Sequence, residues 1–313
     1  MARRLLVAVP TLLGLSLLIF ILISLAPGDP AEELTRQRFG SVEPTETDVA
    51  RTRAELGLDR PAVEQYVSWL GGAITGDLGT GFNRGIAVST EIWQAFRITL
   101  GLAILAVVLV MAVAIPLGIA AAMLHNRWPD HVLRFLTLVG ASVPGFFLAY
   151  VLIYLFSVRL GWLPVAGRGG LDHMLLPAVT LAVVPTAIVS RLLRSSLLET
   201  FGENYVRAAR AKGLSATAVV VRHGLRNGAI PVVTYLGTLL AGLLDGVLIA
   251  EFIFAWPGLG RLTLESIGAR DYPMVQGIVL VGGALYVILN LAVDLSYRLL
   301  DPRIRLEGAH ARA

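Results

Sequence analysis

The residues that carry the commonest enzyme chemistry are scarce in this chain and do not stand in catalytic patterns. The 313 residues include no cysteine and a single lysine, Lys212. Lys212 precedes Gly213, whereas a phosphate-binding loop needs Gly-Lys followed by Ser or Thr. The His-Glu-x-x-His spacing of zinc proteases and the Gly-x-Ser-x-Gly turn of serine hydrolases are also absent. We therefore predict no catalytic residue, no cofactor and no ATPase activity in this chain.

The histidines offer few metal ligands. His125 and His131 fall in one polar connection and His173 in another, and a lone histidine in such a place is more often solvated or a capping group than a ligand. Without cysteine, the chain has neither a disulfide nor a thiolate site. We predict no metal site.

The composition places most of the chain in lipid. Hydrophobic residues make up 56% of the sequence, charged residues only 15%, and the mean hydropathy is +0.72. The charges cluster between long apolar stretches, which is typical of membrane spans joined by loops. The net charge of +4 does not indicate nucleic-acid binding, because the basic residues alternate with apolar spans and form no continuous basic face.

Six apolar stretches are long enough, or nearly so, to cross a hydrocarbon core of about 30 Å at about 1.5 Å per helical residue. They are residues 5–26, 99–124, 135–158, 175–190, 229–254 and 274–297. The fourth is short and carries Pro177 and Pro185. The first resembles a cleaved signal peptide in having Ser24 and Ala26, but its apolar region is too long, so we favour a retained helix. The predicted fold is an all-α integral membrane protein with six transmembrane helices.

Arginine and lysine are distributed unequally between the two sides of a six-span model. On the side with fewer basic residues, the short connections contain only Arg159, Arg168, Arg261 and Arg270. Because positive charge is retained on the cytoplasmic side, both termini are predicted to be cytoplasmic. The domains are then the cytoplasmic end with the first span (1–26), an extracytoplasmic helical segment (27–98) and a five-helix core (99–313).

The extracytoplasmic segment has helical signals of its own. Thr47 is a plausible N-cap for a helix that ends near Leu56, with Gly57 beyond its end. Asp59 and Pro61 open a second helix that runs through Trp69.

The cytoplasmic segment 191–227 is the most informative part of the sequence. Asn204 is expected to cap a short helix through Lys212, Gly213 to end it in a left-handed conformation, and Ser215 to cap the next helix. The small residues Ala208 and Ala209, with Arg207 and Arg210 on one side, suit docking to a cytoplasmic protein. The alternative is a basic loop held on anionic lipid.

This segment resembles the loop by which ABC importer permeases couple to their ATPase subunits. The resemblance rests on Arg207-Ala208-Ala209-x-x-x-Gly213, on Leu225-Arg226-Asn227 and on Pro231. Arg replaces the Glu of the general pattern and the proline comes several residues later, as in the peptide/nickel branch of the family. The resemblance implies that Arg207, Ala208, Ala209, Gly213, Leu225, Arg226 and Asn227 couple the chain to the ATPase.

Further motifs in family order extend the resemblance over nearly the whole chain. They are Ala26-Pro27-Gly28-Asp29-Pro30, Leu56-Gly57-Leu58-Asp59-Arg60-Pro61, Gly76-Asp77-Leu78-Gly79, Pro257-Gly258-Leu259-Gly260 and Leu300-Asp301-Pro302-Arg303. The resemblance implies the type I importer permease fold in a bacterial inner membrane. It also implies four partners besides lipid: a homologous second permease, two cytoplasmic ATPase subunits and an extracytoplasmic substrate-binding protein.

Within the branch, three stretches look more like nickel permeases than peptide permeases: 254–258, 270–273 and the tail 307–310. Nickel, as a chelate, is therefore the expected cargo and a dipeptide or oligopeptide the alternative. Such importers usually leave selection to the binding protein, so a permease can pass nickel without a tight site.

Charged residues inside spans are costly in lipid and tend to face a cavity or another helix. Asp245 and Glu251 lie in the fifth span, but six residues of separation put them about 240° apart around the helix. Asp245 is the preferred candidate for the translocation path, and Glu251, near the outer end, is expected to reach the headgroups. Asp294 and Arg298 in the sixth span are expected to form a structural pair.

Two other classes of protein fit the sequence less well. An ion-coupled secondary transporter would need charges near the middle of several spans, and only Asp245 is clearly so placed. An intramembrane enzyme would need a paired catalytic set, which the chain lacks.

A cysteine replacing Ser215 tests the predicted orientation, because the native chain has no cysteine to interfere. We expect Ser215→Cys to react with a membrane-impermeant thiol reagent only after the cells are opened. Labelling of intact cells from outside would contradict the topology.

Overall fold

The computed structural model describes residues 2–40 and 43–300, and it omits the side chains of some helical residues in that range. Every regular element in the described part of the chain is a helix, apart from one isolated bridge between Thr80 and Ala87. The predicted all-α fold is confirmed. The chain forms two compact units, made of residues 1–99 with 257–288 and of residues 100–256 with 289–313. This grouping follows packing, so the division by membrane side proposed above stays a prediction.

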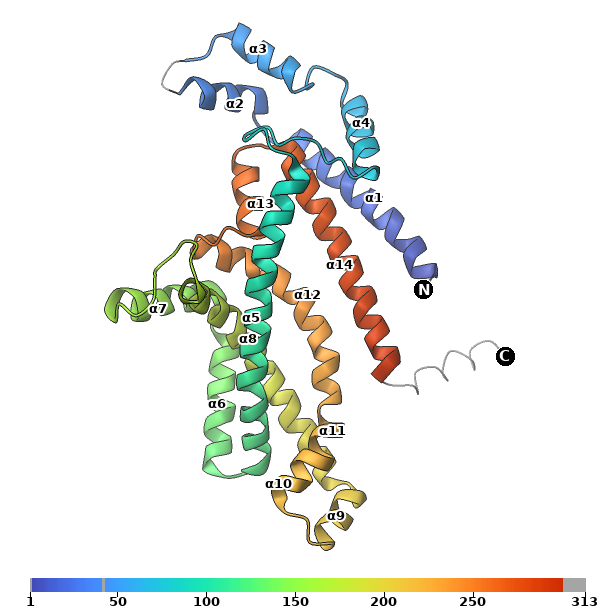
Figure 1. The fold of residues 1–313 in the computed structure, drawn as a ribbon, viewed down its shortest axis with the longest axis vertical. Coiled ribbons are helices and arrows are strands. Elements are labelled where there is room, and N and C mark those ends of the chain that lie inside the picture. The colour runs from blue at the N-terminus through green and yellow to red at the C-terminus, as the bar shows by residue number, and fades with distance from the viewer. Residues whose placement is uncertain (1, 41–42, 301–313) are drawn as a thin grey trace. The chain divides into compact units, whose positions relative to one another are not determined.

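The first unit contains the N-terminal helix and the short helices that follow it (Figure 1). Its helices are α1 Ala2–Leu25, α2 Pro30–Phe39, α3 Glu46–Glu55, α4 Ala62–Ile74, the start of α5 Val88–Met123, α13 Leu259–Gly268 and the start of α14 Tyr272–Leu300. The sequence analysis missed α2, which is short and polar. Asp29 caps it by accepting a 2.9 Å hydrogen bond from the Ala31 N–H, and Pro30 occupies its first turn.

The cap of α3 differs from the prediction. Thr45 and not Thr47 is the N-cap, because Thr45 and Asp48 form a reciprocal capping box two residues earlier. The hydrogen bonds from Thr45 lower the pKa of Asp48 below its ordinary value. Gly57 follows the helix with φ +67°, as expected. The next helix, α4, continues beyond Trp69 to Ile74.

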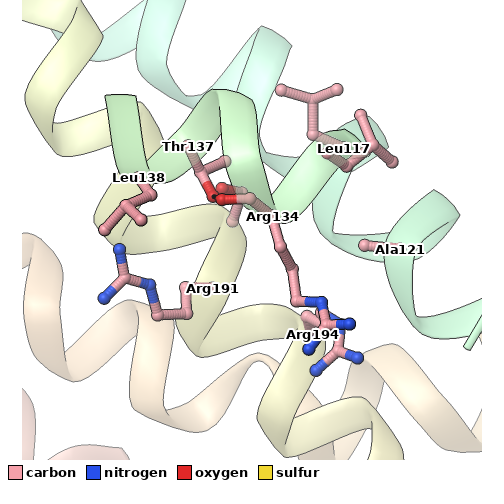
Figure 2. A pocket seen from close by; sticks show the side chains of 9 residues that line it. Leu117, Ala121, Arg134, Thr137, Leu138, Arg191 and Arg194 are labelled. Carbon is pink, nitrogen blue, oxygen red and sulfur yellow. Dashed lines mark hydrogen bonds between the residues drawn. The ribbon is translucent and has the colours of Figure 1, made fainter. Parts of the chain in front are cut away.

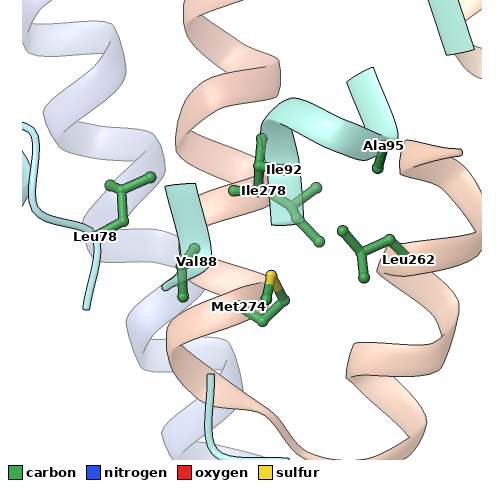
Figure 3. Close-up of a cluster of buried hydrophobic side chains, with 7 residues drawn as sticks. All are labelled: Leu78, Val88, Ile92, Ala95, Leu262, Met274 and Ile278. Carbon is green, nitrogen blue, oxygen red and sulfur yellow. The ribbon is translucent and has the colours of Figure 1, made fainter. Parts of the chain in front are cut away.

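An apolar core holds the first unit together. The start of α5 and Leu78, in the connection before it, meet α13 and α14 (Figure 3). The cluster consists of Leu78, Val88, Ile92, Ala95, Leu262, Met274 and Ile278, all at most 9% exposed. Gly277 permits this contact, since a Cβ there would lie 2.5 Å from the Val88 side chain.

Two of the sequence motifs meet in this unit. Gly28, at φ +107°, leaves room for the Arg270 guanidinium, which a Cβ would displace. The neighbouring Asp271 is 4% exposed and accepts hydrogen bonds from the backbone N–H groups of Asn83 (3.0 Å) and Met274 (3.3 Å). The 270–273 stretch therefore fixes the loops at Gly28 and Asn83 to the beginning of α14.

The second unit is built around α8 Leu171–Gly202, which packs against α6, α7, α11 and α12. Its other helices are the rest of α5, α6 Trp128–Ser142, α7 Gly145–Leu152, η1 Ile153–Arg159, α9 Asn204–Ala211, α10 Ala216–Val219, η2 Val220–Gly224, α11 Leu225–Gly228 and α12 Ile230–Ile253. The fourth predicted span lies within α8, which is much longer than expected and passes through Pro177 and Pro185 without a break.

The third predicted span, 135–158, is not one straight helix. The helices 128–142 and 145–159 meet at 103°. Pro144 explains the break, because proline lacks a backbone N–H and forces Val143 out of the helical region, here to φ −79° and ψ 124°.

Four helices in the described part of the chain are long and apolar enough to cross a membrane, and the bent pair makes a fifth if it counts as one span. They include residues 6–25, 88–123, 171–202 and 272–291. The remaining predicted span, 229–254, corresponds to α12, which has 24 residues. Several of its side chains, including Asp245, lie outside the described residues. So do the Asp294 and Arg298 side chains, residues 301–303 of the Leu300 motif and the tail 307–310.

Helix α5 crosses α8 at Gly118. A Cβ at this glycine would lie 2.9 Å from the Ser190 carbonyl oxygen and 3.0 Å from the Leu193 Cβ. Both are positions that an adjacent helix cannot easily vacate, so the glycine allows the two backbones to approach.

We expect Gly118→Ala to lower the melting temperature of the purified protein, because its methyl group would push α5 away from α8. Gly101→Ala in the same helix is the control, since its Cβ would meet nothing nearer than Met174 Cε at 3.8 Å. Alanine favours a helix interior by about 1 kcal/mol over glycine, so the control is expected to be neutral or stabilising. Equal melting temperatures for the two variants would contradict the close crossing.

Candidate coupling and translocation site

The predicted cytoplasmic segment begins as a continuation of α8. Residues 191–202 remain helical, and the chain turns at Glu203 with φ −67° and ψ 145°. The Glu203 carbonyl accepts hydrogen bonds from the N–H groups of Val206 (3.1 Å) and Arg207 (3.2 Å) and so starts α9. Asn204 is thus the first residue of the helix and not its cap, which corrects the prediction by one position. Arg207 Nη2 donates to the Gly202 carbonyl at 2.9 Å.

The end of α9 has the predicted geometry. Gly213 adopts φ +85°, and the Leu214 N–H donates to the Ala209 carbonyl at 3.3 Å, as in a Schellman motif. Ser215 then caps α10, since its Oγ accepts from the Ala218 N–H at 3.3 Å. The left-handed glycine and the serine cap are both confirmed.

The two predicted alanines of α9 lie in different environments. Ala209 is 8% exposed and packs, like Val206, within this chain, whereas Ala208 and Arg207 are exposed. Ala208 and Arg207 are therefore the pair that an external protein can reach. The Arg210 side chain lies outside the described residues.

The end of η2 and α11 are fixed closely to α8 by two glycines, Gly224 and Gly228, that the sequence analysis did not select. A Cβ at Gly228 would lie 2.9 Å from Leu197 Cδ2, and one at Gly224 would lie 3.2 Å from the same atom. Their Gly-x-x-x-Gly spacing was the available signal. Leu225 between them is half-buried. The Arg226 and Asn227 side chains are outside the described part of the chain.

Helix α12 carries the two predicted acidic residues of the path. Glu251 is fully buried, so the expectation that it reaches the headgroups is wrong. Its surroundings are the tightly packed end of α12, where the Trp256 N–H donates to the Glu251 carbonyl at 2.8 Å. The backbone of Asp245 lies in the same helix.

A largely apolar cavity of about 400 Å³ lies between α7, α8 and α12. Phe146, Pro185, Tyr235, Gly242 and Gly246 are among the residues that line it. Two glycines one turn apart remove side chains from one face of α12. This face of α12 therefore borders the cavity.

A buried carboxylate ties the start of α6 to α8. The Asp130 side chain is fully buried and receives two hydrogen bonds from Arg194, from Nε at 2.8 Å and from Nη2 at 2.7 Å. The Asn126 N–H donates a third at 3.1 Å. Arg134 lies 3.7 Å away and His125 lies 3.8 Å away. One negative charge is therefore surrounded by at least two positive ones.

The histidines of the predicted loops take part in such local contacts. His125 Nδ1 lies 3.1 Å from Arg194 Nη2, and His131 Nδ1 lies 2.6 Å from Arg134 Nη2. His173 stands in the first turn of α8 and not in a loop, with its Nδ1 3.1 Å from Asp172. In the part of the chain that the structure describes, no group of three or more His, Asp or Glu side chains is arranged to hold a metal ion.

The helical fold, with its third predicted span bent, is that of an ABC transporter permease. One solved structure with this fold is described as "Inward facing conformations of the MetNI methionine ABC transporter", with a TM-score of 0.57, 16% identity and coverage of 67% of this chain and 96% of that chain. A second is an amino acid ABC transporter crystallised with histidines, with a TM-score of 0.52, 17% identity and coverage of 67% and 94%.

The chain belongs to the binding-protein-dependent transport system inner membrane component family, whose model matches residues 114–306. A model for the N-terminal part of such membrane components matches residues 1–103. The glutathione transport system permease protein GsiC of Salmonella typhi is 41% identical over 97% of both chains, and that of Escherichia coli is 39% identical over the same share. The protein is a multi-pass membrane protein and a permease subunit of an ABC importer.

Removing the charge of Asp130 tests whether the buried pair stabilises the second unit. Asp130→Asn leaves the Arg194 guanidinium, 14% exposed, without its counter-ion, and we expect a loss of about 3 kcal/mol, seen as a lower melting temperature. Arg194→Gln in the Asp130→Asn background is expected to recover part of the loss, because no charge is then left unpaired. A wild-type melting temperature for Asp130→Asn would show that the pair contributes nothing.

Proposed function

We propose that this permease subunit passes short peptides of the glutathione class. The observation that carries the proposal is the 41% identity to glutathione permeases over 97% of both chains. The expectation of nickel depended on short stretches, one of which, 270–273, serves in packing the first unit. The whole-chain relationship therefore favours the alternative of a peptide over nickel.

The proposed assembly follows the family. A second homologous permease completes the pore, two cytoplasmic ATPase subunits hydrolyse ATP, and an extracytoplasmic binding protein delivers the cargo. Both termini and the 191–227 segment face the cytoplasm of a bacterial inner membrane, and residues 27–98 lie outside. The unequal distribution of arginine supports this orientation.

Coupling in this proposal runs through α9. Arg207 and Ala208 present an exposed surface to the ATPase, and Ala209, Gly213 and Leu225 keep that surface fixed to the membrane helices. Arg226 and Asn227 belong to the same proposed element. Gly224 at the end of η2 and Gly228 in α11 both pack on α8. A displacement of α9 by the ATPase is therefore transmitted to α8 through packed helices and not through a flexible loop. Alternating access then follows from movement of packed helices.

The proposed path for the cargo runs along α12. Asp245 remains the preferred polar residue of that path, and the glycine face at Gly242 and Gly246 supports a route on this helix. Glu251 is the second candidate. Because it is completely buried in this subunit, it can contact the cargo only after the helices move.

Substitutions in α9 test the coupling role. Ala208→Glu places a bulky charge on the exposed docking surface, and we expect uptake by the assembled complex to fall at least about tenfold, whereas Ala208→Ser stays near wild type. Gly213→Val is expected to do the same by forcing a β-branched residue to φ +85°, whereas Gly213→Asn, which tolerates that conformation, keeps most activity. Normal uptake and normal ATPase co-purification with Ala208→Glu and Gly213→Val would refute the role.

The cargo is tested with the complete complex in proteoliposomes. We expect ATP-dependent uptake of radiolabelled glutathione or a dipeptide and only background uptake of radiolabelled nickel, with or without a histidine-like chelator. Vesicles without the binding protein are the control, because cargo selection is assigned to that subunit. Nickel uptake in the absence of peptide uptake would return the assignment to nickel.

A further inference from the structure

A cavity of about 190 Å³ lies where the C-terminal end of α5 and the N-terminal end of α6 meet α8 (Figure 2). Leu117, Leu133 and Leu138 supply apolar walls, and Arg134, Arg191 and Arg194 supply positive charge. Figure 2 shows Arg191 on one side of the cavity and Arg134 beside Arg194 on the other. None of the residues proposed above for ATPase contact or for the cargo path lines this cavity.

The charges of the cavity do not balance. Asp130 accepts two hydrogen bonds from Arg194. In the described part of the chain, Arg134 has one ion pair with a carboxylate, its 3.7 Å contact with the same Asp130. Arg191 is exposed, and no hydrogen bond or ion pair joins it to any described side chain. Three arginines therefore line the cavity, and the carboxylate of Asp130 contacts two of them, which leaves an excess of positive charge.

The remaining polar groups of the lining do not supply negative charge. The Thr137 hydroxyl donates to the Arg134 carbonyl at 2.9 Å and the Ser190 hydroxyl donates to the Ala187 carbonyl at 3.2 Å. Both donors are satisfied within their own helices. An incoming group must therefore be anionic to balance the arginines and partly aliphatic to cover the leucines.

We propose that this cavity binds an anionic phospholipid, with the phosphate held between Arg134 and Arg191 and an acyl chain along Leu117, Leu133 and Leu138. Guanidinium groups bind phosphate oxygens through paired hydrogen bonds. Basic cavities between transmembrane helices on the cytoplasmic side are suited to lipid headgroups. The apolar walls favour a lipid over free phosphate, because phosphate alone would leave them exposed to water.

The position of the cavity gives the bound lipid a regulatory consequence. Arg191 and Arg194 stand on the part of α8 that continues to Gly202 and from there to α9. A phosphate that joins Arg191 to Arg134 would hold α8 against α6 at the base of the proposed coupling element. This consequence rests on the proposed coupling function, whereas lipid binding itself does not.

Lipid retention measured by native mass spectrometry tests the site in the purified full complex. The complex is exchanged into mixed micelles with equal amounts of phosphatidylglycerol and phosphatidylcholine. We expect the wild type to retain phosphatidylglycerol at least about fivefold better than phosphatidylcholine, and Arg134→Gln/Arg191→Gln to lose that preference. Arg191→Gln alone changes an exposed residue and is therefore not expected to disturb folding. We expect this variant to lose most of the preference for phosphatidylglycerol and Arg191→Lys to keep part of it.

Arg127→Gln is the matched control. Arg127 is exposed in the connection between α5 and α6 and does not line the cavity. Its replacement changes the net charge by the same amount as Arg191→Gln and is expected to leave lipid retention unchanged. A second arm adds inorganic phosphate in large excess, which is expected not to displace the lipid.

Several outcomes would overturn the proposal. They are equal lipid retention by the wild type and the double variant, an equal loss with Arg127→Gln, displacement by inorganic phosphate, or loss of a partner subunit from Arg191→Gln, which would make the cavity a protein interface. Failure of peptide uptake with normal lipid retention would reject the proposed function and leave the lipid site standing. ATPase activity in vesicles with and without phosphatidylglycerol then measures the regulatory consequence, and equal activity would remove it.

Discussion

Helices that cross a membrane gain little from burying leucine against leucine, since lipid tails are as apolar as the side chains. Close backbone approach must provide the packing instead, and in the second unit it occurs at small residues. Gly118 allows α5 to reach the carbonyl of Ser190, and Gly228 allows α11 to reach Leu197. Both contacts involve α8. The proposed path, the proposed coupling segment and the Asp130 cluster are all arranged around that helix, so each depends on these crossings.

Electrostatics adds a second restraint on α8. An uncompensated buried carboxylate is very costly, so Asp130 has to keep Arg194 within hydrogen-bonding distance. The pair fixes the register of α6 against α8 at one end, where dispersion contacts alone would allow sliding. The first unit is held differently, by an apolar cluster and by Asp271, which binds backbone N–H groups of two segments distant in sequence.

Much of the fold follows from the sequence because lipid restricts the choice. A long apolar stretch can only be a helix there, and this predicts the spans. Local signals also succeeded where one residue decides the conformation, as with Gly213 and Ser215. They failed where neighbours compete: Thr45 displaced Thr47 because it finds Asp48 three residues on, and Pro144 broke a stretch that hydropathy alone describes as continuous. Burial of Glu251 depends on tertiary packing, which periodicity does not report, and the Gly-x-x-x-Gly spacing of Gly224 does not say which helix it contacts.

The uninterrupted length of α8 has a mechanical consequence. Thirty-two residues at about 1.5 Å each give a rod of about 48 Å, well beyond the roughly 30 Å of the hydrocarbon core. A tilt of only about 5° about one end then displaces the other end by on the order of 4 Å, roughly three quarters of a helical turn. The helix thus acts as a lever. A small rotation of its membrane-spanning part moves its far end by several ångströms.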